Sequence, residues 1–301
     1  MMSNTDAPLV GDSFKLGYRF QNFWDVPMAT AFFFGELGAG TFLISMYFDF
    51  VAGMIFGLIC TGVGKPFFHL THMGVPAKSW RAMLRPDRSW ISRGLISIMV
   101  FIPFGILVVL DQAFGWSGGG AVGKLIQLIA VAAALLVMTY QGFAMSHSSS
   151  IALWNTGLMP VSSMAYALLG GAAVTLLLGS ALNSLLDADL VLLEKLFLAL
   201  LVGTLAILLS LLHAAYHGTR GGQQSVTLLI KESFSLPFYT LVLGAGILLP
   251  LIVLWFGGGA LVSAFVAAAG VLVGFFSYRV LIFKAGVYEP QISFAARLGL
   301  H

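Results

Sequence analysis

The sequence predicts an all-α integral membrane protein that crosses the bilayer about eight times, and both its composition and its long apolar stretches support this fold class. Hydrophobic residues make up 59% of the chain and charged residues only 9%, whereas a soluble domain carries roughly 25% charged residues. A membrane-spanning helix needs about 20 apolar residues, and unbroken stretches of this length exclude membrane strands, which alternate polar and apolar residues. The expected spans are 26–47, 50–70, 91–111, 122–145, 158–181, 190–213, 236–256 and 259–283.

Very little polar sequence separates the first two spans. Only Asp49 interrupts the apolar stretch from Phe42 to Lys65, so we expect a tight turn at residues 46–49 and a short or tilted second span. Residues 1–25 are polar, and the apolar stretch that follows is longer than the core of a signal peptide, which is about 7–15 residues. This stretch is therefore expected to remain as the first span.

The basic residues predict the orientation. With eight spans, both termini lie on the same side as the loops after spans two, four and six, and this side carries thirteen of the fifteen Lys and Arg residues. Because basic loops stay in the cytoplasm, we expect a protein of the inner (cytoplasmic) membrane with both termini cytoplasmic. The thirteen residues are Lys15, Arg19, Lys65, Lys78, Arg81, Arg85, Arg88, Arg93, Arg220, Lys231, Arg279, Lys284 and Arg297, and the other side has Lys124 and Lys195.

A carboxylate in the middle of the first span is the most informative polar group. Glu36 would cost about 2.5–3.5 kcal/mol at the centre of a membrane helix, so it requires a partner, a water-filled cavity or a proton. One interpretation makes Glu36 a proton-handling group near a redox site. The other makes it a protonated or hydrogen-bonded residue that only joins helices.

The histidines and the single cysteine limit the cofactors that this chain can hold. A haem relay across the membrane needs ligands in both leaflets, but the internal histidines all map to the cytoplasmic end, so we expect no haem. A single haem at the cytoplasmic end stays open. Against it, His213 and His217 are four residues apart and share one helix face, whereas a haem sandwich needs ligands on opposite sides. Cys60 alone cannot hold an iron–sulfur cluster, which typically needs four Cys ligands, and no metal site is predicted. The internal histidines are His69, His72, His147, His213 and His217.

Polar and aromatic residues at the cytoplasmic ends of spans one and four are candidate ligands of a quinone. A quinone head needs hydrogen bonds to two carbonyl oxygens, an apolar slot for its tail and a proton source. Of the candidates, Tyr140 and Glu36 are the ones expected to transfer protons. The expected quinone-binding residues are Gln21, Asn22, Trp24, Asp25, Tyr140 and Gln141.

Several short segments carry a family resemblance through their order along the chain. They are FGELGAGTF at 34–42, GKP at 64–66, RPDRSWISRG at 85–94, YQG at 140–142, ALWN at 152–155, MP at 159–160 and the pair Tyr278-Arg279. In this order they resemble the NrfD-like family, which includes the membrane subunit of polysulfide reductase. The resemblance covers nearly the whole chain.

The resemblance implies two four-helix bundles without haem, with a quinone site at the end of the first bundle. It implies a cytoplasmic segment at 1–25, a first bundle at 26–147, a second bundle at 148–284 and a cytoplasmic tail at 285–301. In the family, polar residues at the start of span one and a tyrosine in span four line the quinone pocket, and these positions correspond to Gln21, Asn22, Asp25 and Tyr140. The quinone is ubiquinone or menaquinone.

The resemblance also implies partners. An iron–sulfur subunit would dock against the quinone site and serve a molybdopterin subunit that contains molybdenum or tungsten, so this chain would carry out the quinone reaction of an oxidoreductase complex without binding the substrate of the catalytic subunit. The basic docking face places these partners in the cytoplasm. The docking residues expected between spans two and three are Lys78, Arg81, Arg85, Arg88 and Arg93.

Two features depart from the family pattern. Its members usually have a longer segment between spans one and two, and a small residue where this chain has Glu36, which suggests a proton route particular to this subgroup.

A secondary transporter or channel that uses Glu36 to handle protons is the alternative function. Transporters usually have helices broken near the midplane, whereas here the distinctive polar run lies at the interface. A third alternative is an anchor that binds no quinone. The sequence does not indicate the substrate, the direction of electron flow, the quinone type, proton translocation or the oligomeric state.

Overall fold

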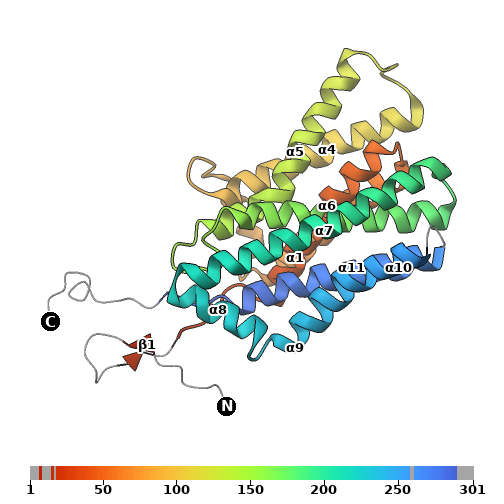
Figure 1. Ribbon diagram of the computed structural model, residues 1–301. Coiled ribbons are helices and arrows are strands. Elements are labelled where there is room, and N and C mark those ends of the chain that lie inside the picture. Colours follow the sequence, from red (N-terminus) through yellow and green to blue (C-terminus); the bar gives the residue numbers. More distant parts are fainter. Residues whose placement is uncertain (1–6, 9–14, 17, 258–260, 290–301) are drawn as a thin grey trace.

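The computed structural model describes residues 7–8, 15–16, 18–257 and 261–289. Among these residues, eight helical spans are long and apolar enough to cross a membrane, so the chain is an all-α multi-pass membrane protein, as predicted (Figure 1). Six spans are single helices: α1 (Val26–Tyr47), α4 (Trp90–Phe114), α5 (Ala121–Ser146), α6 (Leu158–Leu182), α7 (Asp187–Gly218) and α11 (Leu261–Lys284).

The second and seventh spans each contain a π-helical segment. The second span consists of α2 (Val51–Ile59), η1 (Cys60–Gly64) and α3 (Lys65–His72), and the seventh of α9 (Ser235–Pro237), η3 (Phe238–Leu248) and α10 (Leu249–Gly257). Both π segments end two residues before a proline, Pro66 or Pro250. Proline has no backbone N–H to donate to the preceding turn, and a π-turn is one way for a helix to continue through such a gap.

Four short elements lie outside the spans. The strands β1 (Ala7–Pro8) and β2 (Lys15–Leu16) pair antiparallel. The 3-10 helix η2 (Pro76–Met83) precedes α4, and α8 (Arg220–Ile230) connects α7 to the seventh span.

The tight turn expected at residues 46–49 is confirmed. The helix α1 ends at Tyr47, α2 begins at Val51, and Asp49 between them has a φ of 51°. A short polar residue tolerates this left-handed conformation better than most. The carboxylate of Asp49 accepts a hydrogen bond of 2.7 Å from the side-chain amide of Gln112 on α4, which holds the turn against the end of that helix.

The helices α1 and α6 form the centre of the assembly, because each packs against helices of both halves of the chain. Their backbones approach closely where Gly40 faces Ala167 and Gly171: a Cβ at Gly171 would overlap the backbone of Gly40 and Thr41. Small residues allow this approach. The proposed division into two four-helix bundles stays a prediction, because the two halves share this central contact.

The segments that flank the first and last spans pair with each other. The backbone N–H of Gln21 donates to the carbonyl of Gly286, and that of Tyr288 donates to the carbonyl of Arg19. The last span therefore ends beside the start of the first. The side chain of Lys15, Arg297 and most of the predicted tail at 285–301 lie outside the described residues.

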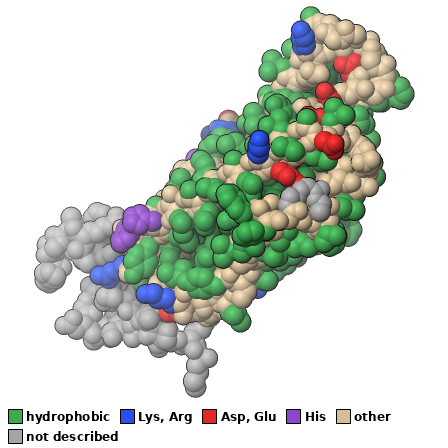
Figure 2. Space-filling model, turned by 45° about the vertical axis from the view of Figure 1, so that its right-hand side comes forward, with side chains coloured by type: hydrophobic (Ala, Val, Ile, Leu, Met, Phe, Trp, Pro, Cys, Tyr) green, Lys and Arg blue, Asp and Glu red, His purple; other side chains and the backbone are tan. Residues whose placement is uncertain are grey.

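Charge is distributed unevenly along the molecule. On the face shown in Figure 2, hydrophobic side chains cover the middle, Asp and Glu gather toward the end that carries the α4–α5 turn, and His gathers near the other end. We call the end that carries η2 and the start of α1 the basic end. The prediction counts Lys65 and Arg279 among the loop charges of this end. In the structure both residues belong to helices and both side chains are buried. The orientation prediction therefore depends on the other eleven of the thirteen basic residues.

The close contact between α1 and α6 predicts that a single added methyl group will destabilise the fold. We expect Gly171→Ala to lower the free energy of unfolding by at least about 1–3 kcal/mol, the usual cost of overpacking, because backbone atoms cannot move aside like a side chain. The control is Gly203→Ala on α7, where a Cβ would meet nothing within 4 Å. Denaturant unfolding in mixed micelles gives the measurement, and equal stability of the two variants would contradict the prediction.

Candidate functional site

A fully buried ion pair joins the first and last spans. The Arg279 side chain on α11 donates to one carboxylate oxygen of Glu36 on α1, from Nε at 2.8 Å and from Nη2 at 2.6 Å, and both side chains are 0% exposed. Charge in the middle of an apolar bundle is costly unless it is paired and hydrogen-bonded. The pair supplies the partner that Glu36 requires.

The helices α6 and α5 provide further contacts of the guanidinium. Arg279 Nη2 donates to the hydroxyl of Ser163 at 2.7 Å, and Nη1 lies 4.0 Å from the sulfur of Met145 on α5. The neighbouring Tyr278 donates its phenol to Ser162 at 3.0 Å. Arg279 therefore fixes the relative positions of α1, α6 and α11.

A second buried cation lies beside this pair. Lys65, the first residue of α3, is 3% exposed, and its ammonium donates to the carbonyl of Ala31 at 3.4 Å. The same nitrogen lies 5.2 Å from the ring centroids of Phe32 and Tyr140. Gly35 makes room for it, since a Cβ there would lie 2.7 Å from Lys65 Cδ. Aromatic faces stabilise a desolvated ammonium.

The buried polar residues around Glu36 and Lys65, which we call the buried cluster, are not fully hydrogen-bonded. Within the described part of the chain, Glu36 Oε1, both amide atoms of Gln141 and Nδ1 of His69 are buried without a hydrogen-bond partner. Native proteins leave few buried polar atoms unpaired, and each such atom points to a water, an ion or a ligand. They belong to α3 and to α1 and α5, the two other helices that the Lys65 ammonium contacts.

The helix α5 presents Tyr140 and Gln141 to this cluster. Tyr140 is 5% exposed, and its ring packs where Gly94 of α4 has no side chain. Gln141 is fully buried, and its amide nitrogen and Lys65 Nζ would each lie 3.0 Å from a Cβ at Gly35. These two predicted site residues therefore lie next to Lys65 and the Glu36 pair.

The other four predicted quinone ligands line a surface pocket of about 390 Å³ at the start of α1. Leu228, Phe234 and Lys284 complete much of its wall, and neither Tyr140 nor Gln141 reaches it. The four are Gln21, Asn22, Trp24 and Asp25. The structure thus divides the predicted set into an interfacial group and a buried group.

Two members of the interfacial group already serve the fold. The side-chain amide of Gln21 donates to the carbonyls of Trp24 and Phe283, both at 2.8 Å, and its oxygen accepts the backbone N–H of Trp24 at 2.9 Å. Trp24 also packs edge-on against Phe32, with ring centroids 5.3 Å apart. Asn22 is exposed and free to contact a ligand.

Asp25 belongs to the interfacial group and also contacts α3, the helix that carries Lys65. It caps α1 by accepting the backbone N–H of Met28 at 3.3 Å, and its carboxylate lies 3.3 Å from Nδ1 of His72 at the end of α3. The carboxylate lines the pocket on one side and contacts α3 on the other. From His72, the same helix leads to His69 and Lys65.

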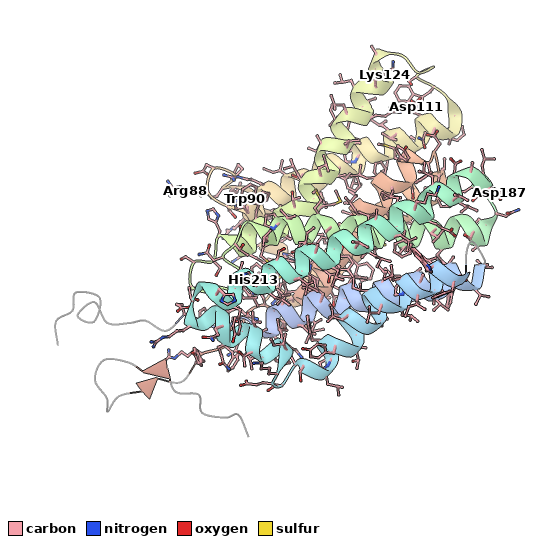
Figure 3. All side chains as sticks on the ribbon, viewed as in Figure 1. Arg88, Trp90, Asp111, Lys124, Asp187 and His213 are labelled. Atoms are coloured by element: carbon pink, nitrogen blue, oxygen red, sulfur yellow. The ribbon has the colours of Figure 1, made fainter. Side chains whose placement is uncertain are left out.

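Four of the five predicted docking residues project from the basic end. Lys78, Arg81, Arg85 and Arg88 are exposed, on η2 and the loop before α4. Figure 3 shows Arg88 and Trp90 at the opposite end of the molecule from Asp111, Lys124 and Asp187.

Arg93, the fifth, is bound to the fold. It donates to the carbonyls of Pro86 and Asp87 at 2.8 and 3.1 Å, and its guanidinium lies 4.4 Å from the centre of the Trp90 ring. Its main contacts hold the loop that presents Arg85 and Arg88.

Residues 16–290 match the family model described as polysulphide reductase, NrfD. The chain belongs to the NrfD family. A search of curated proteins finds no match.

Sequence reasoning missed Lys65, Arg279 and Ser163 as members of the site. The two cations were counted as loop charges because each lies close to a predicted span end. One signal was present: an intramembrane carboxylate requires a partner, and Arg279 is a basic residue inside a predicted span. The identification of Lys65 also required the π-turn before it, which no periodicity in the sequence indicates.

The buried pair predicts strong coupling between Glu36 and Arg279. We expect Arg279→Met and Glu36→Gln each to lower the free energy of unfolding by about 3–5 kcal/mol, because each leaves a buried charge without its partner. The double variant should cost clearly less than the sum of the two. Denaturant unfolding of all four proteins measures the coupling, and purely additive losses would show that the two side chains do not stabilise each other.

Proposed function

We propose that this NrfD-family protein is the membrane anchor and quinone-binding subunit of an oxidoreductase complex. It exchanges electrons between an iron–sulfur partner and the quinone pool of the membrane, and that partner serves a molybdopterin subunit with molybdenum or tungsten. Family membership supports the anchor role. Ubiquinone and menaquinone both suit this role, because both present two carbonyl oxygens to the same donors.

The unpaired buried polar atoms between α1, α3 and α5 are the observation that carries the quinone proposal. A quinone head needs two hydrogen-bond donors and a proton source inside an apolar environment. The Tyr140 phenol and the Gln141 amide are positioned as donors beside Lys65, and Asp25 lies at the surface end of the same helix interface. Most well-formed ligand sites have this character of apolar walls with a few convergent polar groups.

The position of the buried polar residues around Lys65 also suits electron transfer from the iron–sulfur partner to the quinone. The segment from His72 through η2 to α4 carries the exposed basic residues, and His72 contacts Asp25. A partner that docks on this segment lies on the same side as the start of α1. The distance between an iron–sulfur cluster and the quinone head is then short. The excess of basic residues supports a cytoplasmic location for this end and hence for the partners.

The first test replaces Tyr140 with phenylalanine. We expect Tyr140→Phe to leave the complex assembled and to lower quinone-coupled turnover about tenfold or more, the lower range for the loss of a positioned proton-transfer group. Turnover with a dye that takes electrons from the soluble subunits should persist.

A paired variant identifies which group of residues holds the quinone. Asn22→Leu changes the interfacial pocket and leaves the buried group intact. If Asn22→Leu abolishes quinone turnover and Tyr140→Phe does not, the head lies in the pocket and the proposed position is wrong. Equal loss with dye and with quinone would indicate misfolding instead.

The second test concerns docking. We expect the double variant Arg85→Gln/Arg88→Gln to release the iron–sulfur partner from washed membranes, because two exposed charges at the proposed interface are lost. Lys124→Gln/Lys195→Gln is the control, since both lysines were assigned to the opposite side. Retention of the partner by the Arg85/Arg88 variant at raised salt would show that the basic residues do not contribute to docking.

A further inference from the structure

The helix α3 carries three basic side chains on one face, and the proposed function does not use them all. Lys65, His69 and His72 follow the spacing i, i+4, i+7, which places them on one side of a helix. With a rise of 1.5 Å per residue, Lys65 and His69 are about 6 Å apart along the axis, and His69 and His72 about 4.5 Å apart.

The outer end of this row reaches water. The His72 imidazole is 27% exposed and the Asp25 carboxylate 45% exposed, with 3.3 Å between Nδ1 and the carboxylate oxygen. Both side chains of this contact are therefore accessible to water at the basic end.

The inner end reaches the buried cluster. Lys65 lies against Tyr140 and beside Gly35, and Glu36 follows Gly35 on α1. Between the two ends, Nδ1 of His69 is buried and has no hydrogen-bond partner in the described residues. Glu36 Oε1 and the Gln141 amide are unpaired in the same way. Waters that pair with these atoms would join the row into a continuous chain.

We propose that Lys65, His69 and the His72–Asp25 pair form a proton path from the basic end to the quinone site. The proposal rests on the proposed function. For each quinone reduced, two electrons arrive from the iron–sulfur partner and two protons arrive along α3. Tyr140 gives its phenol proton to the quinone oxygen that faces it, Lys65 returns a proton to Tyr140, and His69 restores Lys65. The second proton follows the same row and reaches the other oxygen through the waters at the unpaired Gln141 amide and Glu36 Oε1. Quinol oxidation uses the same steps in reverse.

The path explains why a lysine occupies this position. A buried lysine can release its proton, whereas arginine remains protonated in proteins. Arg279, which holds the fold together, needs a permanent charge. Lys65 forms no ion pair by distance among the described residues, so its charge can change without breaking one.

The decisive variant is Lys65→Arg, which keeps the positive charge and removes proton exchange. In the assembled complex, with a short-chain quinol analogue or its quinone as the probe, we expect turnover to fall at least tenfold while dye-linked turnover persists. The control Lys195→Arg, at an exposed position on α7, should behave like the wild type. Wild-type rates in Lys65→Arg would overturn the path, because charge alone would then be sufficient.

A second variant tests the same path if Lys65→Arg does not fold because arginine does not fit at the buried position. We expect His69→Gln to lower the maximal rate with little change in KM, and added imidazole to restore part of that rate. His147→Gln, at the exposed end of α5, is the control and should show neither effect. Loss of rate in His69→Gln without imidazole rescue would assign His69 a structural role and overturn the path. Absence of quinone turnover in the wild type would overturn the proposed function itself, whereas wild-type rates in both variants would overturn the path alone.

Discussion

The pairing of Arg279 with Glu36 is the constraint on which the rest of the structure depends. The two residues are 243 positions apart in the chain, and their contact requires the last helix to lie directly against the first. Ser163 on α6 binds the same guanidinium. Three spans from both halves of the chain are therefore fixed around one group, in a region where an unpaired charge would be strongly destabilising.

Close backbone packing makes this arrangement feasible. The short Arg279–Ser163 contact and the Gly40–Gly171 approach both lie between α6 and its neighbours. Association of helices in lipid depends on such packing and on interhelical hydrogen bonds, because the lipid tails are as apolar as the side chains. The small residues and the polar contacts thus act together: the first bring the helices close enough for the second to form.

Most of the helical architecture could be predicted from the sequence, because the spans are defined by length and apolar composition alone. The tight turn at Asp49 could also be predicted, since a lone polar residue divides two apolar stretches. The candidate site was harder to predict from the sequence. Gln21, Asn22, Trp24 and Asp25 were expected beside Tyr140, but the depth of Tyr140 and the presence of α3 between the groups depend on tertiary packing.

The two buried cations near Glu36 show the limit of reasoning from position along the chain. Lys65 and Arg279 lie near predicted span ends, where a basic residue normally contacts lipid headgroups or water. Their burial depends on contacts made by other helices, and for Lys65 also on the π-turn that precedes Pro66. The NrfD resemblance placed Tyr278 and Arg279 in a shared motif, but a motif does not indicate which residue it contacts.

The sequence separation of the buried pair has a consequence for membrane insertion. At about 5–20 residues synthesised per second, the 243 residues between Glu36 and Arg279 correspond to roughly 10–50 s during which the first helix exists without the last. Lys65 enters with the very next span, and its side chain lies beside Gly35, the neighbour of Glu36 in the chain. The ion pair between Glu36 and Arg279 can form only after the eighth span has been released from the ribosome.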